Sequence, residues 1–332
     1  MSVLQVNNIT DTGGSTLLGR RNAIINGNFD VWQRGTSQTA TGYGSADRWN
    51  SSIGTSTQSV SQQTFTVGQT DVPNNPKYFY RNVVTTGSTA GSYAAVQYKI
   101  EGVETFAGET VTLSFYAKAD SSKNIAVEFT QYFGTGGSPS TAISSIEVTT
   151  VALTSSWAKY TVTVDIPSVS GKTLGTNGND FLRFYFWLDA GSDFNARTNS
   201  LGNQSGTFDI AQVQLEKGSV ATAFERRSYW EELALCERYY RRWDNVEPEH
   251  DRIPSNGGFS GSMFLMYEEM RAAPTASYSD FEARDAGNNS QAIASVNTTA
   301  TRGAQFITSG EPAGGTFRFI SASGYLELDA EL

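Results

Sequence analysis

The side chains that enzymes use for nucleophilic or metal chemistry are sparse in this sequence. Its one histidine, His250, stands in an acidic stretch, EPEHD, without a cysteine or second histidine at a spacing that binds zinc. The chain has no G-x-S-x-G element, no glycine-rich phosphate loop ending in G-K-[ST] and no H-E-x-x-H pair. Two carboxylates about 5 to 9.5 Å apart suffice to hydrolyse a glycosidic bond, and 33 acidic residues leave that alternative open. We expect a binding or structural protein and not an enzyme.

Aromatic side chains in polar loops indicate a different chemistry, the stacking of a flat ring on a sugar beside polar groups. Tyr43 and Tyr93 are flanked by glycine and serine, and they are our candidates for glycan contact. The larger aromatic residues Trp32, Trp49 and Trp187 lie in segments that read as strands or as structural motifs, and we assign them to the core.

Composition narrows the class of protein further. The net charge is −9, which argues against a nucleic-acid-binding protein. No run of 18 apolar residues is present, so we expect no membrane insertion. One cysteine excludes an intrachain disulfide. The 32 glycines, together with many serine, threonine and asparagine residues, are typical of a β protein with polar turns.

Alternating apolar residues predict many short strands before residue 225 and no helices. The run TVTLSFYAKA places Val111, Leu113, Phe115 and Ala117 on one face of a strand over 110–119. Further strands are expected at 125–133, 158–166, 181–188 and 207–216. The strand at 181–188 is apolar on both faces, and the strand at 207–216 has a bulge between Ile210 and Val213. Strand signals return at 262–267, 305–308 and 316–328.

The segment 229–243, YWEELALCERYYRRW, carries the strongest helix signal. Its apolar residues step by 4, 3, 4 and 3, the spacing of a seam between copies of one helix, and S-x-x-E at Ser228 predicts a capping box. The oligomerisation residues predicted from this seam are Tyr229, Leu233, Cys236, Tyr240 and Trp243. A single amphipathic helix lying on a sheet is the alternative, because two heptads are fewer than a coiled coil normally needs.

These elements predict a mainly β protein with four parts: an N-terminal arm (1–20), a β-sandwich (21–225), a helical neck (226–246), and a linker followed by a small C-terminal β domain (247–332). The arm has few apolar residues and cannot fold alone. We expect Leu4, Val6 and Ile9 to anchor it on another protein.

Three segments carry a family resemblance. They are RNAIINGNFDVWQRG with the later ADRW, FDIAQVQLE with GSVATAFERRSYWEELALCERYY, and MRAAPT at 270–275. Together they resemble bacteriophage tail-fibre and related fibrous virion proteins. The block from Asn22 to about Glu216 is similar to a carbohydrate-binding-module jelly roll, which commonly opens with N-G-x-F-[DE] and closes with V-x-L-E.

This resemblance implies a homotrimeric virion protein on the tail or capsid exterior. It implies attachment to other virion proteins through the N-terminal arm and presentation of glycan-binding-like domains to a host surface glycan. A capsid or neck decoration protein without receptor binding is the alternative, and a polysaccharide depolymerase is a third hypothesis. In modules of this kind a structural calcium often joins the first and last strands, and Asp30 and Asp209 match by position.

Overall fold

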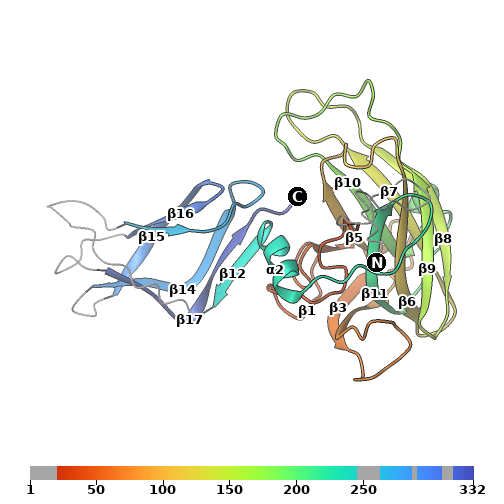
Figure 1. The fold of residues 1–332 in the computed structure, drawn as a ribbon, viewed down its shortest axis with the longest axis horizontal. Coiled ribbons are helices and arrows are strands. Elements are labelled where there is room, and N and C mark those ends of the chain that lie inside the picture. Colours follow the sequence, from red (N-terminus) through yellow and green to blue (C-terminus); the bar gives the residue numbers. More distant parts are fainter. Residues whose placement is uncertain (1–20, 245–261, 286–289, 309–316) are drawn as a thin grey trace, which may run out of the picture. The chain divides into compact units, whose positions relative to one another are not determined.

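The computed structural model describes residues 21–244, 262–285, 290–308 and 317–332. The chain divides into two compact units between Glu232 and Leu233, and each unit has its own β-sheets (Figure 1). The arm residues Leu4, Val6 and Ile9, the linker and His250 lie outside the described residues. Within the described ranges, neither helix is long and apolar enough to cross a membrane.

The first unit is a sandwich of two antiparallel sheets, which confirms the predicted fold class. The six-stranded sheet has the order β1-β3-β4-β11-β6-β9, and the five-stranded sheet has the order β2-β5-β10-β7-β8. The strands of the first are β1 (Ser37–Gln38), β3 (Thr57–Thr64), β4 (Tyr78–Thr85), β11 (Gly206–Lys217), β6 (Thr110–Ala119) and β9 (Ala158–Asp165). The strands of the second are β2 (Trp49–Ile53), β5 (Tyr93–Glu101), β10 (Phe181–Ala190), β7 (Lys123–Tyr132) and β8 (Ile143–Leu153).

Side-chain alternation explains how these sheets enclose a core. Strand β6 has the predicted bounds, and Val111, Leu113, Phe115 and Ala117 are fully buried on one face, in the main apolar cluster of the sandwich. Strand β10 is apolar on both faces, as predicted, because its second face is also covered. The predicted bulge in β11 is confirmed by a shift in its pairing with β6 between Ala211 and Gln214.

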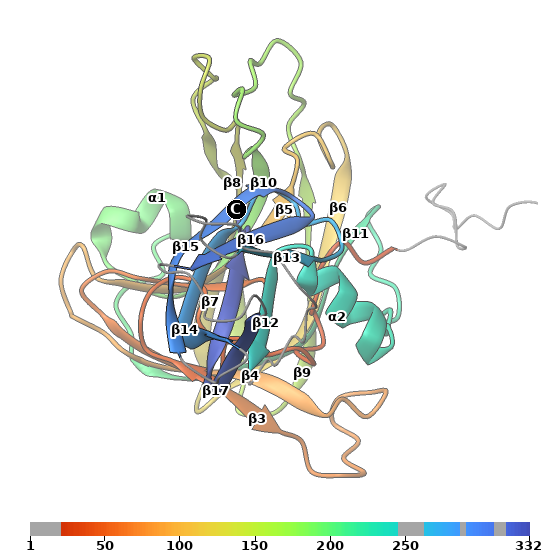
Figure 2. The same ribbon diagram turned by 90° about the vertical axis from the view of Figure 1, so that its left-hand side faces the viewer.

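A short helical segment covers the outer face of the five-stranded sheet, where no helix was predicted. A 3₁₀ turn, η1 (Ser192–Phe194), leads into α1 (Asn195–Thr198), which contacts β7, β8 and β10 and is seen beside the sandwich in Figure 2. Asn199 ends α1 in a left-handed conformation, with φ of 51°. One turn of helix is too short for hydrophobic periodicity to predict.

The predicted helix 229–243 is correct at its start and wrong at its end. Helix α2 (Tyr229–Glu237) begins where expected, and the Glu231 amide donates to the Ser228 hydroxyl at 3.3 Å. Tyr240 and Trp243 lie on a strand, β12 (Tyr240–Asp244), and therefore do not continue a helical seam.

Backbone partners from the second unit explain why α2 stops. Strand β12 pairs with β17 (Phe317–Asp329), and the carbonyls of Arg238 and Tyr239 accept the amides of Arg271 and Ala330. Tyrosine and tryptophan also favour strands over helices. The strand preference and these tertiary hydrogen bonds together outweigh the helical spacing of the apolar residues. The boundary between the two compact units falls inside α2, between Glu232 and Leu233.

The second unit is a six-stranded antiparallel sheet with the order β12-β17-β14-β15-β16-β13. The remaining strands are β13 (Ser262–Met266), β14 (Thr275–Asp285), β15 (Ser290–Ala300) and β16 (Gly303–Thr308). Figure 2 shows β14, β17 and β12 running side by side. Its described core includes Tyr267, Met270, Leu326 and Leu328, against which Trp243 packs.

Candidate glycan-binding site

Residues 21–35 form the opening segment of the sandwich, and a buried asparagine, Asn26, holds its backbone in place. The Asn26 side chain donates to the carbonyls of Val31 and Asp47 at 2.8 and 3.0 Å, and it accepts the Val31 amide at 2.9 Å. Gly27 packs on β11 so closely that a Cβ there would lie 2.1 Å from the Val213 carbonyl oxygen. These contacts fix the backbone that presents Asp30 and Trp32.

The segment that precedes α2 is fastened to the same opening segment. Arg227 donates to the carbonyls of Ile24 and Asn22, and its Nη1 lies 3.2 Å from Oε1 of Glu232. Glu225 accepts the Asn22 amide at 3.1 Å. The ERRSYWEE sequence thus closes the sandwich on its own first residues, which places Arg226 and Tyr229 beside Asp30.

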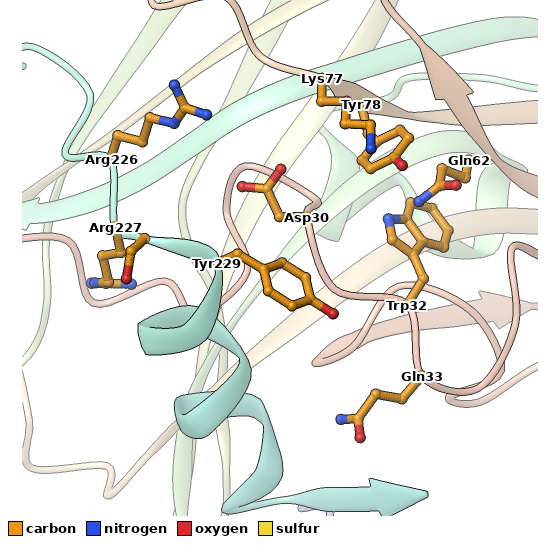
Figure 3. A pocket seen from close by; sticks show the side chains of 10 residues that line it. Asp30, Trp32, Gln33, Gln62, Lys77, Tyr78, Arg226, Arg227 and Tyr229 are labelled. Atoms are coloured by element: carbon orange, nitrogen blue, oxygen red, sulfur yellow. The ribbon is translucent and has the colours of Figure 1, made fainter. Parts of the chain in front are cut away.

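A cavity of about 820 Å³ opens between these segments and the start of β4 (Figure 3). Its lining comes from the opening segment, from β3, from β4 with the residue before it, and from the approach to α2. The lining residues are Asp30, Trp32, Gln33, Gln62, Lys77, Tyr78, Arg226, Arg227, Ser228 and Tyr229.

Asp30 is the acidic side chain of this cavity. In Figure 3 it lies between Arg226 on one side and Lys77 and Tyr78 on the other. Burial raises the pKa of the Asp30 carboxyl above its usual value, and a hydrogen bond from Asn28 (2.8 Å) together with the charges of Arg226 and Lys77 opposes that rise. Its carboxylate is therefore partly desolvated and suited to accept hydroxyl hydrogen bonds.

Three aromatic rings line the same cavity. The Trp32 ring is half-buried and stacks on Tyr80, with ring centroids 5.8 Å apart, while its Nε1 donates to the Phe29 carbonyl. Tyr229 keeps 49% of its surface exposed. Gln62 adds a carboxamide that makes no hydrogen bond with any part of the chain that the structure describes. Flat apolar faces beside free polar atoms are the chemistry that sugar rings need.

The two tyrosines predicted from the sequence are not in this cavity. Tyr93 lies at the start of β5, and its ring packs on Trp187 and Phe194 at 5.7 and 4.9 Å. Tyr43 is half-buried, with the Arg34 guanidinium 5.5 Å from its ring centroid. Whether either residue contacts a glycan stays a prediction.

The predicted calcium ligands do not form a common cluster. Asp209 on β11 binds Arg81 through two hydrogen bonds of 2.7 and 2.8 Å, and Lys118 lies 3.8 Å away. Asp30 lies in the cavity instead. No three histidine, cysteine, aspartate or glutamate side chains gather as metal ligands anywhere in the described ranges. Whether a calcium ion binds at either aspartate stays a prediction.

The outer face of the five-stranded sheet is closed by α1. Arg197 donates to both carboxylate oxygens of Glu128 at 2.8 and 2.9 Å, and the Trp187 indole donates to the same carboxylate at 2.9 Å. Glu128 is fully buried, and Trp187 is 2% exposed. Trp187 is buried as predicted, although beneath α1 and not between the sheets, and its ring is not available to a ligand.

Trp32 was assigned to the core, and it does pack against the main apolar cluster of the sandwich. Sequence reasoning missed that Trp32 also lines the cavity, and it did not select Tyr78 or Tyr229 as candidates for glycan contact. Asp30 and Trp32 are two residues apart, so in an extended segment their side chains lie on the same face. A charged residue on that face indicates that the face is solvent-accessible. The other half of the cavity comes from a segment about 195 residues later in the chain, and no local pattern could predict that approach.

The fold of this chain is similar to those of several solved structures. No protein-family profile and no curated protein matches the chain. A CBM4 structure is 15% identical with a TM-score of 0.32, covering 58% of this chain and 98% of that one. The family 11 carbohydrate-binding module of a Clostridium thermocellum cellulosomal cellulase is 13% identical with a TM-score of 0.32, over 56% of this chain and 98% of its own.

A phage protein is also similar. The enzymatically active domain of tailspike protein 4 from bacteriophage CBA120 is 12% identical with a TM-score of 0.33, covering 59% of this chain and 21% of that one. The β-sandwich assignment rests on the strand pairing of the two sheets, independently of these similarities.

Proposed function

We propose that the sandwich binds a glycan in the cavity beside Asp30. The observation that carries this proposal is the convergence of Trp32, Tyr78 and Tyr229 with Asp30 and Gln62 in one open cavity. Sugar rings are amphipathic, so aromatic faces take their apolar side while carboxylate and carboxamide groups take their hydroxyls.

Binding without hydrolysis fits this site. Asp30 is the one acidic residue among the described side chains that line the cavity. Glycoside hydrolysis normally needs two carboxyl groups about 5 to 9.5 Å apart. The proposal is therefore of a recognition module, and release of reducing ends from a bound polysaccharide would contradict it.

Matched variants test the proposed site. Tyr229→Ala should weaken glycan binding by about tenfold, because stacking on one aromatic ring contributes on the order of 1 kcal/mol or more. Tyr278→Ala is the control, since Tyr278 is also an exposed tyrosine and is absent from the lining. Gln62→Ala with Gln63→Ala is a second pair, because Gln63 donates to Ser61 and does not line the cavity.

Binding would be measured by a glycan array followed by calorimetry on the full chain. If Tyr229→Ala and Gln62→Ala weaken glycan binding and their controls do not, the result supports the cavity as the binding site. Binding that survives both cavity variants would place recognition elsewhere, and Tyr43→Ala and Tyr93→Ala would then be examined. A chain that binds no glycan would favour the alternative of a structural decoration or connector protein.

We further propose that the chain is a fibre protein on the exterior of a bacteriophage virion, a homotrimer attached through residues 1–20. What supports this is the sequence resemblance, including the ERRSYWEE segment that fastens the sandwich. The helical seam supports the trimer less than the sequence predicted, because only Tyr229, Leu233 and Cys236 of its residues lie on α2.

Oligomeric state and assembly can be tested separately. Light scattering should give three times the mass of the 36.0 kDa chain, and a monomer mass would contradict the trimer. Deleting residues 2–15 should leave the protein folded yet absent from assembled particles. A truncated protein that still incorporates would show that attachment lies outside the arm.

A further inference from the structure

Two cations stand at the rim of the cavity without a carboxylate partner. The Lys77 ammonium lies 4.8 Å from the Tyr78 ring centroid, and Arg226 donates to the Asn74 carbonyl at 3.3 Å. Both side chains are exposed, and neither forms an ion pair with any residue in the described ranges. In a chain of net charge −9, two unmatched cations facing one cavity are unusual.

Several other cations of the sandwich have carboxylate partners. Arg81 binds Asp209, Arg197 binds Glu128, and Lys217 lies 2.7 Å from Glu109. Asp30 does not fill that role for Lys77 and Arg226, because it influences both through space without lying within ion-pair distance of either. Lys77, Arg226 and Asp30 together leave one positive charge at the cavity.

We propose that the ligand of this cavity is an anionic saccharide, whose charged group lies between Lys77 and Arg226 while its ring stacks on the aromatic lining. This inference rests on the proposed glycan-binding function and names the class of glycan. Arginine presents a planar fork of donors that matches a carboxylate or a phosphate, and lysine adds a mobile point charge. A neutral sugar would leave both cations without a counter-charge.

Asp30 and the lining rings explain why a saccharide fits better than a simple anion. The Asp30 carboxylate repels a free anion, whereas it accepts a hydroxyl of a sugar whose charge lies farther out at the rim. The cavity volume of about 820 Å³ admits more than one sugar unit. The charged group and the ring are thus recognised by different parts of the cavity.

The test compares charged and neutral saccharides of matched length. The probes are oligogalacturonate with neutral oligogalactose of the same length, and a hexose 6-phosphate with the unphosphorylated hexose. Each is titrated into the full chain by calorimetry at low salt and at about 0.15 M salt. The variant is Lys77→Gln/Arg226→Gln, and the control is Lys172→Gln/Lys217→Gln, which removes the same two charges outside the cavity.

We expect the charged probes to bind more tightly than the neutral ones, and more weakly as salt rises. The cavity variant should lose about tenfold in affinity for the charged probes and change little for the neutral ones, while the control changes neither. The uronate and the phosphate arms show which anion is preferred. Equal binding of charged and neutral probes would overturn this inference and leave the proposed function standing. Binding of no saccharide would overturn both.

Discussion

Arg227 and Glu232 form a buried ion pair, 3.2 Å from Nη1 to Oε1, that joins the approach of α2 to its first turn. Both side chains are less than 10% exposed, and each also holds the opening segment. Arg227 donates to the Ile24 carbonyl at 3.0 Å, and Glu232 accepts the Asn26 amide at 2.5 Å. The first turn of α2 is therefore part of the sandwich.

The first prediction follows from this pair. Arg227→Met should lower the free energy of unfolding of the sandwich by about 3–5 kcal/mol, because it leaves the Glu232 carboxylate buried without its cation. Arg226→Met, one residue earlier and exposed, is the matched control and should change stability by less than about 0.5 kcal/mol. Urea unfolding followed by tryptophan fluorescence measures both, and equal stabilities would contradict the role of the pair.

The second prediction concerns the close approach of Gly27 to β11. Gly27→Ala should destabilise the sandwich by about 3 kcal/mol. The new Cβ would lie 2.1 Å from the Val213 carbonyl oxygen, so the backbone of the opening segment or of β11 would have to move. Gly91→Ala is the control, since its Cβ would meet nothing closer than 3.6 Å. Thermal unfolding compares the two. A Gly27→Ala protein that melts like the wild type would show that the opening segment is free to shift.

The third prediction concerns pH and Asp30. Its raised pKa means that the native state holds the proton more tightly than the unfolded chain, so Asp30 disfavours folding at neutral pH. That cost is relieved as pH falls through the raised pKa toward 3.8, the ordinary pKa of an aspartate. Asp30→Asn should therefore raise the melting temperature at pH 7. The difference from wild type should shrink as pH falls through the raised pKa and be lost below about pH 4.

The same substitution should weaken glycan binding, because an amide accepts hydroxyl hydrogen bonds less strongly than a carboxylate. A variant that gains stability and loses binding would show that Asp30 is kept for function. Lower stability at pH 7, with binding unchanged, would contradict both parts of this prediction.

Local patterns predicted the strands well, because the burial of alternate side chains leaves a direct trace in the sequence. Strand β6 and the bulge in β11 are examples. The end of α2 could not be predicted, since it depends on amides of Arg271 and Ala330 that meet the carbonyls of Arg238 and Tyr239. The cavity was missed for the same reason, because Asp30 and Arg226 are brought to it by the contacts of Arg227 and Glu225 with the opening segment.

The last prediction concerns the short helical segment, η1 and α1, that covers the outer face of the five-stranded sheet. Arg197 is the cation for Glu128, whose carboxylate is fully buried and also accepts the Trp187 indole and the Ser145 amide. Arg197→Met should cost about 3 kcal/mol, because the remaining hydrogen bonds do not neutralise a buried charge. Adding Glu128→Gln should recover part of the loss, since a neutral carboxamide still accepts hydrogen bonds.

A double-mutant cycle measured by urea unfolding separates the effect of each substitution on stability from the coupling between Arg197 and Glu128. A coupling energy of more than about 1 kcal/mol between Arg197 and Glu128 would show that this pair fastens α1 onto the sheet. Hydrogen exchange should then show the amides of residues 192–201 opening in Arg197→Met before the strands do. Additive effects with unchanged exchange would show that the aromatic packing of Phe194 on Trp187 and Tyr93 holds the cover without the ion pair.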